Sequence, residues 1–276
     1  MWNENYYECP DVIVFSDLDG SLLEPITYSF KSALPGLKFL QERNIVPVFA
    51  SSKTASEISI VQEESGCIGP LICENGGAIV ERKDRQNSVI KAFGRPRKSW
   101  LSKLHQLRDD LAVSFRGFSD WSISDLRKQT GLSELAARAA QARHFSEPII
   151  WEDSDTMLDH FRIELERINL VAIEGGQFLS IQSKYDKGKA TRWWQSHQNE
   201  SSPVIIALGD GPNDESMLSA ADIAVVIKSP KSHFLNIKGP RRVIYTANTG
   251  PEGWTEGLIE ALFTVNCHSS ISLKSA

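Results

Sequence analysis

Two acidic motifs, each placed after an apolar run, contain the residues of this chain that could do chemistry. In VIVFSDLDGSL, the first of them, Asp17 and Asp19 follow a β-branched run and precede Gly20. Side chains at i and i+2 of an extended segment share a face, so the two carboxylates could converge unless the chain turns between them. Two such charges repel and require a cation or a shared proton, and hard oxygen ligands fit Mg²⁺. The alternative is a surface Asp-Gly turn, since this dipeptide is common in turns.

The second motif, GDGPND, follows the buried-strand pattern VIIAL of residues 204–208. Pro212 suits the first turn of a helix, and Asn213 and Asp214 place acceptors and negative charge at its positive end. Helix capping explains Asp214, but it does not require Asp210 as well. Ligands of open α/β sheets usually bind at the strand ends, and here two separate strands end in acidic residues. We therefore predict a metal site formed by both motifs.

The order of these motifs resembles that of the haloacid dehalogenase superfamily of phosphohydrolases. DLDGS resembles its first motif and GDGPND its fourth. The hydrophobic run IVPVFASS places Ser51 where the family has its phosphate-binding Ser or Thr. DKGKA, at the start of a predicted helix, places Lys187 where the family has its phosphate-binding lysine. The resemblance implies an α/β fold, with a Rossmann-like catalytic core and an inserted α/β cap of the C2B type.

The middle of the chain more closely resembles the mannosyl-3-phosphoglycerate phosphatases. That family hydrolyses a mannosyl- or glucosyl-3-phosphoglycerate to the glycosylglycerate, a compatible solute, and phosphate. Gln177 stands where we expect a basic residue and Trp121 where a Met is more usual, which leaves the identity of the sugar open. The segments that carry the resemblance are SSKT (51–54), ENGGAIV (74–80), GFSDWS (117–122), TGLSELAARAAQAR (130–143), HFSEP (144–148) and EGGQFLSI (174–181).

The chemistry implied by this resemblance is phosphoryl transfer in two steps with Mg²⁺ as cofactor. Asp17 attacks phosphorus in line and forms an aspartyl-phosphate. Asp19 gives a proton to the leaving alkoxide and then takes one from the attacking water. Asp17 is also a metal ligand, as is Asp19 through its backbone carbonyl, and Asp210 is the second carboxylate ligand. Asp214 binds a metal-bound water or orients a neighbouring side chain.

The residues expected to bind the substrate each have a structural alternative. Lys187 and Ser51 neutralise the phosphate oxygens in the first interpretation; in the second, Lys187 is a solvated helix-start lysine and Ser51 only ends a strand. Asn213 is expected beside the phosphate. Arg143 could form a two-pronged contact with the substrate carboxylate, or it could be a charge that interacts favourably with the end of a helix.

Strands and helices alternate along the chain, which is typical of an α/β fold. A polar break, KDRQNS, begins at residue 83, so we predict a catalytic core of residues 1–83 and 185–276 and a substrate-specificity cap of residues 84–184. The strands are expected at 12–16, 46–50, 71–73, 78–81, 89–93, 148–151, 170–174, 178–182, 204–208, 223–226 and 243–245. The helices are expected at 31–43, 54–64, 98–111, 123–128, 134–142, 156–167, 187–196 and 252–265.

The composition, 41% hydrophobic and 24% charged residues, is ordinary for a soluble globular protein. The 276 residues suffice for two domains, and the net charge of −5 disfavours a nucleic-acid or anionic-membrane partner. No apolar run reaches the length of a membrane span, and the first residues lack the pattern of a signal peptide. The four cysteines have no paired metal-ligand spacing, so we expect reduced thiols and a cytoplasmic location.

Three functions remain in competition. The first is the Mg²⁺-dependent glycosyl-3-phosphoglycerate phosphatase. The second is another sugar-phosphate enzyme, either a sucrose-phosphate-like phosphatase or a mutase of the phosphomannomutase type. The third is a catalytically silent binding protein, against which the presence of Asp17, Asp19, Lys187 and Asp210 argues.

Overall fold

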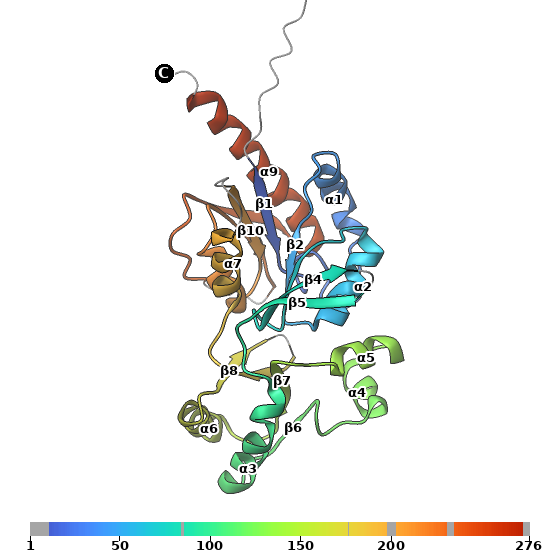
Figure 1. Ribbon diagram of the computed structural model, residues 1–276, viewed down its shortest axis with the longest axis vertical. Helices are drawn as coiled ribbons and strands as arrows, with labels where there is room; N and C mark the ends of the chain where they lie inside the picture. Colours follow the sequence, from blue (N-terminus) through green and yellow to red (C-terminus); the bar gives the residue numbers. More distant parts are fainter. Residues whose placement is uncertain (1–10, 84–85, 176, 198–202, 231–234, 273–276) are drawn as a thin grey trace, which may run out of the picture. The chain divides into compact units, whose positions relative to one another are not determined.

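The protein is described by a computed structural model, which covers residues 11–83, 86–175, 177–197, 203–230 and 235–272 (Figure 1). The chain divides into two compact units, Met1–Val48 with Thr191–Ala276 and Phe49–Ala190. Both units combine strands with helices, which confirms the predicted α/β class. No helix in this described part of the chain is long and apolar enough to cross a membrane.

Four parallel strands form the sheet of the first unit, in the order β12-β11-β10-β1. Their bounds are β1 Val12–Ser16, β10 Val204–Gly209, β11 Ile223–Lys228 and β12 Arg242–Thr249. Strands β1 and β10 pair in register from Val12↔Val204 to Ser16↔Leu208. The residues that follow the two strands therefore emerge at the same edge of the sheet.

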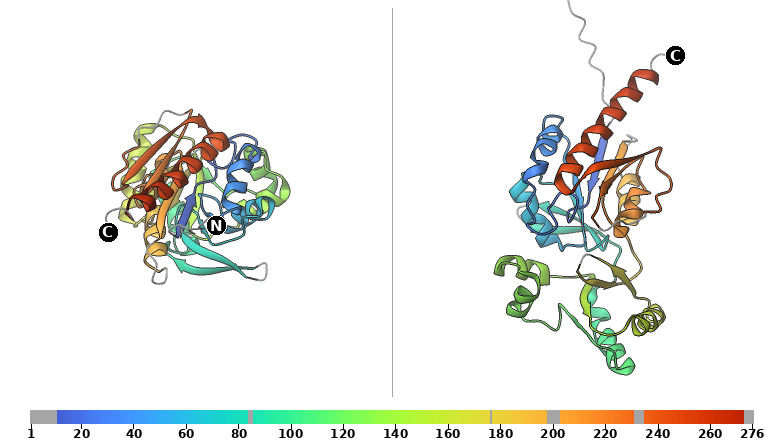
Figure 2. Two further views of the ribbon diagram at one scale, coloured as in Figure 1. Left: turned by 90° about the horizontal axis from the view of Figure 1, so that it is seen from above. Right: turned by 180° about the vertical axis from the view of Figure 1, so that it is seen from behind.

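Helix α9, Gly250–Ser272, packs on β10, β11 and β12 and against α1, Leu34–Gln41 (Figures 1 and 2, red). Its Trp254 is fully buried, and a Cβ added to Gly36 would lie 2.7 Å from the indole ring. The indole N–H of Trp254 donates to Ser16 Oγ at 2.8 Å. Helix α9 therefore supports the last residue of β1. A short turn, η3 Pro212–Asp214, and helix α8, Glu215–Leu218, follow β10.

The second unit contains β3 to β5 and all of β2 except its first residue, Val48. Their bounds are β2 Val48–Ala50, β3 Leu71–Cys73, β4 Ala78–Lys83 and β5 Gln86–Ala92. Strand β3 is parallel to β2 and antiparallel to β4, which in turn pairs antiparallel with β5. Helix α2, Ala55–Ser65, begins at the N-cap Thr54, whose hydroxyl and backbone form a capping box with Glu57. Thr54 is therefore the N-cap of this helix.

A separate antiparallel sheet with the strand order β6-β7-β9-β8 lies within residues 84–184. Ile149 of β7 packs in a cluster with helices α3 and α6, whereas its neighbour Ile150 packs with α4 and α5. Successive strand residues face opposite sides, so helices cover both faces of this sheet. The strands are β6 Phe115–Gly117, β7 Ser146–Trp151, β8 Val171–Glu174 and β9 Leu179–Gln182. The helices are α3 Leu101–Leu111, α4 Ile123–Thr130, α5 Glu134–Gln141 and α6 Asp155–Arg167, and α7 Lys187–Ser196 follows the sheet.

Every predicted strand and helix has a counterpart, but several bounds differ; strand β12, for example, is Arg242–Thr249 where 243–245 was predicted. Strand β6 was not predicted, because it has only three residues and one of them is Gly117, a weak strand former. The helix predicted over 31–43 is a 3-10 turn, Lys31–Ala33, followed by α1. Cys67 and Cys73 are free thiols, as expected; Cys9, the side chain of Cys267 and residue 84 of the predicted domain boundary lie outside the described residues.

Candidate active site

The backbone of Asp17 is held by hydrogen bonds on both sides. Its N–H donates to the carbonyl of Leu208 at 2.9 Å, which continues the pairing of β1 with β10. Its carbonyl accepts from Ser16 Oγ at 2.7 Å, and Ser16 Oγ itself accepts from Trp254. Asp17 is therefore positioned by two strands and a helix, the rigid elements that hold a reactive side chain well.

The chain turns directly after Asp17. The N–H of Ser21 donates to the carbonyl of Leu18 at 3.1 Å, and Gly20 has a φ of +84°. A Cβ at Gly20 would lie 2.6 Å from Asp210 Oδ2, so a glycine is needed for the loop to approach β10 this closely. The Asp-Gly turn is thus present, and Asp17 and Asp19 do not belong to one extended segment.

Asp214 lies in the turn that follows β10. Its Oδ2 accepts from the N–H groups of Asp210 and Gly211 at 3.1 and 3.0 Å. A Cβ at Gly209 would lie 2.6 Å from the Cβ of Asp214, so the strand must end in glycine here. The expected capping role of Asp214 is therefore present. Asn213, in the same turn, is half-buried.

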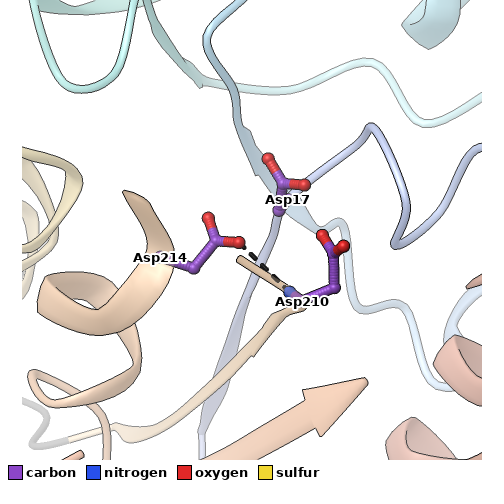
Figure 3. A group of neighbouring side chains, drawn as sticks. All are labelled: Asp17, Asp210 and Asp214. Carbon is purple, nitrogen blue, oxygen red and sulfur yellow. Dashed lines mark hydrogen bonds between the residues drawn. The ribbon is translucent and has the colours of Figure 1, made fainter. Parts of the chain in front are cut away.

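Three carboxylates converge at this edge of the sheet. Asp17, Asp210 and Asp214 each offer an oxygen, and these oxygens lie within 4.8 Å of one another (Figure 3). Asp17 is 4% exposed and Asp214 is fully buried, so their mutual repulsion is poorly screened by water. A set made only of carboxylate oxygens suits a hard divalent cation such as Mg²⁺. The residues present therefore fit the predicted metal.

The two predicted phosphate-binding residues belong to the second unit. Ser51 is buried directly after β2, and its Oγ accepts from the N–H of Lys53 at 3.2 Å. Lys187 is fully buried at the start of α7, whereas Lys189 is exposed. A buried lysine is not the solvated helix-start residue of the alternative interpretation. The role of both residues toward phosphate stays a prediction.

The comparison with known families agrees with this geometry. Residues 14–236 match the family of haloacid dehalogenase-like hydrolases, which spans both acidic motifs and the inserted sheet. The chain belongs to this family. The expected fold, a core of parallel strands with an inserted α/β cap, is therefore confirmed, and the three carboxylates lie within the matched residues of the hydrolase.

Solved structures align with nearly the whole hydrolase. BT1666 from Bacteroides thetaiotaomicron, described among the phosphatases of the haloalkanoate (HAD) enzyme superfamily, shares 18% identity at a TM-score of 0.64 over 96% of this chain and 98% of its own. A haloacid dehalogenase-like hydrolase from B. subtilis shares 18% identity at 0.63 over 91% and 98%. The sucrose-phosphatase from Synechocystis sp. PCC6803, in complex with sucrose and phosphate, shares 16% identity at 0.59 over 93% and 98%. These likenesses show the common fold.

Arg143 of the hydrolase is held by its own chain. Its side chain is 7% exposed, and Nη1 donates to the carbonyl of Ser52 at 3.1 Å and to Ser146 Oγ at 2.9 Å. Its Nη2 lies 3.9 Å from Glu57 Oε2. Within the described residues its Nε is buried without a hydrogen-bond partner. Part of the guanidinium is therefore already hydrogen-bonded within the protein. Its contact with a substrate carboxylate stays a prediction.

Two supporting contacts in the hydrolase were not predicted from the sequence. One is the hydrogen bond from Trp254 to Ser16, which spans 238 positions of the chain and so has no local pattern. The other involves Glu74, which lies in the segment ENGGAIV of the family resemblance. A serine directly before the first aspartate is the one signal that could have pointed to the former contact.

Proposed function

We propose that this hydrolase is a Mg²⁺-dependent phosphatase that acts on a glycosyl-3-phosphoglycerate, mannosyl or glucosyl. The observation that carries the proposal is the convergence of Asp17, Asp210 and Asp214 from the ends of two paired parallel strands. An acidic site without a cation repels an anionic phosphate, whereas a site that holds a divalent cation attracts it.

Asp17 is the nucleophile in this proposal. Its carboxylate attacks phosphorus, the bond from phosphorus to the ester oxygen breaks, and an aspartyl-phosphate forms on the side chain. Asp19 donates a proton to the departing alkoxide and then accepts a proton from the water that hydrolyses the aspartyl-phosphate. The support for Asp17 is its backbone, which Leu208 and Ser16 hold in place.

Asp17, Asp210 and the backbone carbonyl of Asp19 are the proposed ligands of Mg²⁺, with Asp214 binding directly or through water. When bound, the ion supplies positive charge that offsets the charge of the phosphate oxygens. Ser51 and Lys187 contribute a hydroxyl and an ammonium group to the same oxygens, with Asn213 beside them. Such donors stabilise charge that develops in the transition state.

The substrate class rests on the cap segment, residues 84–184, which we propose as the specificity domain. Core residues that bind phosphate and metal are common to every phosphate ester, so the choice of substrate requires other groups. Arg143 is the proposed partner of the glycerate carboxylate, because an arginine matches a carboxylate with two parallel hydrogen bonds. Its buried Nε, without a partner in the described part of the chain, is a donor that the protein leaves unused.

A second candidate substrate is a sugar phosphate without a carboxylate. The fold shared with a sucrose-phosphatase that was solved with sucrose and phosphate favours this alternative. A mutase of the phosphomannomutase type is the remaining enzyme in this group. It would transfer the phosphoryl group to an acceptor sugar instead of releasing phosphate.

The test is phosphate release from a panel of esters by the purified chain, with Mg²⁺ and in chelator. We expect release only with Mg²⁺, and the highest kcat/KM for a glycosyl-3-phosphoglycerate over sucrose 6-phosphate, hexose phosphates and p-nitrophenyl phosphate. A higher kcat/KM for a carboxylate-free sugar phosphate would select the second candidate. Absence of phosphate release from every ester, with and without an acceptor sugar, would refute a phosphatase.

A further inference from the structure

Glu74 is a buried acidic residue that the proposed chemistry does not use. Its side chain is 1% exposed, in the loop that follows β3. Oε1 accepts from the N–H of His144 at 2.9 Å. Oε2 accepts from the N–H groups of Phe145 and Ser146 at 3.0 and 2.8 Å and from Ser146 Oγ at 2.7 Å. One carboxylate therefore binds three consecutive residues that lead into β7 of the cap segment.

The backbone of this loop is strained where it reaches the start of α7. Glu74 and Asn75 have φ values of 49° and 59°, a left-handed conformation that is unfavourable for a residue such as glutamate and is better tolerated by asparagine. Gly76, with a φ of 98°, packs so closely on the chain that an added Cβ would clash with the carbonyl of Asp186 and lie 2.8 Å from the N–H of Lys187. Strain of this kind persists only where the surrounding contacts hold it in place.

The same loop is also bonded to the segment that follows β2. The N–H of Glu74 donates to the carbonyl of Lys53 at 2.8 Å, and the N–H of Asn75 donates to the carbonyl of Ser51 at 2.9 Å. Ser51 and Lys187 are the two residues proposed to bind phosphate. The loop at 74–76 thus contacts both of them through its backbone, while the carboxylate of Glu74 reaches the cap segment.

Arg143 also belongs to this hydrogen-bond network. Ser146 Oγ donates to Glu74 and accepts from Arg143 Nη1, which also donates to the carbonyl of Ser52. The segment from 143 to 146 is therefore tied to the loop after β2 both directly and through Glu74. Four hydrogen bonds to one buried carboxylate fix the position of this segment, because any shift of the segment would break several of them at once.

We infer that Glu74 is a positioning residue, which holds cap residues 144–146 in a fixed register with the phosphate-binding Ser51 and Lys187. This inference rests on the proposed phosphatase function and deepens it. Substrates that extend from the phosphate to the cap require this register, whereas a small ester does not. A misplacement of about 1 Å far from the reacting atoms lowers turnover by as much as 10²-fold.

The first variant is Glu74→Gln, which keeps the shape of the side chain but replaces one acceptor oxygen with a donor. The amide then faces the N–H of His144 or the donors of Phe145 and Ser146. We expect amide hydrogen exchange at 144–146 to accelerate by at least about tenfold, while exchange in β10 stays unchanged. We also expect kcat/KM for the best ester of the panel to fall by about 10–100-fold, with p-nitrophenyl phosphate hydrolysis within about threefold of wild type.

Glu147→Gln is the matched control. Glu147 is also a buried carboxylate, 1% exposed, and directly follows residues 144–146 in the sequence. It pairs instead with Arg97 and accepts a hydrogen bond from the N–H of Ser119, both within the cap segment. We expect this variant to lower thermal stability without changing the ratio of kcat/KM between the two esters. The same change of ratio in both variants would assign the effect of Glu74 to stability alone and overturn the inference.

A milder variant covers the possibility that Glu74→Gln does not fold. Ser146→Ala removes the hydroxyl between Arg143 and Glu74 and leaves the three backbone bonds, so the same ratio should change by several-fold in the same direction. Equal losses on both esters, or unchanged exchange at 144–146 in folded Glu74→Gln, would overturn the inference. If the wild-type chain hydrolyses no ester, the proposed function fails, and the exchange measurement still decides whether Glu74 holds the segment.

Discussion

Two regions of this protein bury carboxylates, and their surroundings differ. At the ends of β1 and β10, Asp17, Asp210 and Asp214 bring oxygens within 4.8 Å of one another. In the loop after β3, Glu74 stands within hydrogen-bond reach of three backbone N–H groups and a hydroxyl. The first arrangement gathers like charges, and the second surrounds one charge with donors.

The two arrangements differ in what stabilises the buried negative charge. A carboxylate that accepts several hydrogen bonds is stabilised by the chain itself and requires no cation. Three adjacent carboxylates repel one another, and a bound cation offsets this repulsion. Asp214 combines both features, since its Oδ2 accepts two backbone N–H groups while it also lies in the triad. The three aspartates and Glu74 all lie within residues 14–236, the segment that matches the hydrolase family.

The largest expected effect is on turnover. Asp17→Asn should lower kcat by at least about 10⁴-fold, because an amide is a poor nucleophile and a poor metal ligand. Circular dichroism should show an unchanged fold. Asp11→Asn is the matched control, since Asp11 is an exposed aspartate at the opposite end of β1 and should retain full activity. Wild-type turnover in purified Asp17→Asn would refute the covalent mechanism.

Arg143→Ala should separate recognition of a carboxylate from positioning of the cap segment. We expect kcat/KM for a glycosyl-3-phosphoglycerate to fall about 10–100-fold, and for a carboxylate-free sugar phosphate to fall less, because a charged hydrogen-bonding pair is lost only in the former. Arg143→Lys keeps the charge but loses the planar fork, so it should recover only part of the loss. Equal losses on both esters in the alanine variant would assign Arg143 to the network around Glu74.

Stability should respond in opposite ways in the two regions. Glu74→Gln should lower the free energy of unfolding by about 1–3 kcal/mol, because buried N–H donors lose their acceptor. In chelator, Asp210→Asn should leave the free energy of unfolding unchanged or raise it, because the substitution removes one of three charges that repel one another. Urea unfolding of both variants and wild type measures the effect. A loss of stability in metal-free Asp210→Asn as large as that in Glu74→Gln would remove the distinction between the regions.

The smallest expected effect is on the stability of the folded protein at high pH. Burial, and next the charge of Glu74, raise the pKa of the Cys73 thiol above its usual value of 9.0. Above about pH 9 the folded chain therefore keeps a proton on Cys73 that the unfolded chain loses. The contribution of Cys73 to the free energy of unfolding is complete below about pH 9 and declines as the pH rises further, by up to about 1.4 kcal/mol per pH unit. Cys73→Ala should reduce the decline between about pH 9 and pH 10 in urea unfolding. An equal decline in the variant would show that Cys73 does not cause it.

The sequence predicted the triad because its geometry depends on local patterns. Asp17 and Asp210 each follow an apolar strand, and the ends of parallel strands meet at one edge of a sheet. The convergence of Asp19 with Asp17 could not be decided in this way, since it depended on whether the chain turns at Gly20. Strand β6 was not predicted, because its three residues, Phe-Arg-Gly, include an arginine and a glycine and so form no apolar run.

The contacts of Glu74 could not have been predicted from one sequence. Its partners lie 70 to 72 positions further along the chain, and a hydrogen bond that a side chain accepts from a distant backbone N–H leaves no repeating pattern. Arg143 is a similar example, because its bond to the carbonyl of Ser52 spans 91 positions. What the sequence did offer was the dipeptide Asn-Gly after a strand, which indicated the turn but not the bonds that hold it.

The most direct test of the cation site is calorimetric titration of the metal-free wild-type chain with Mg²⁺, in parallel with Asp210→Asn and Glu74→Gln. The three-carboxylate site predicts saturable Mg²⁺ binding by wild type, nearly the same affinity in Glu74→Gln, and an affinity at least about tenfold weaker in Asp210→Asn, since only the last loses a charged ligand. Equal Mg²⁺ affinity in wild type and Asp210→Asn, or no binding by the wild-type chain, would contradict the account.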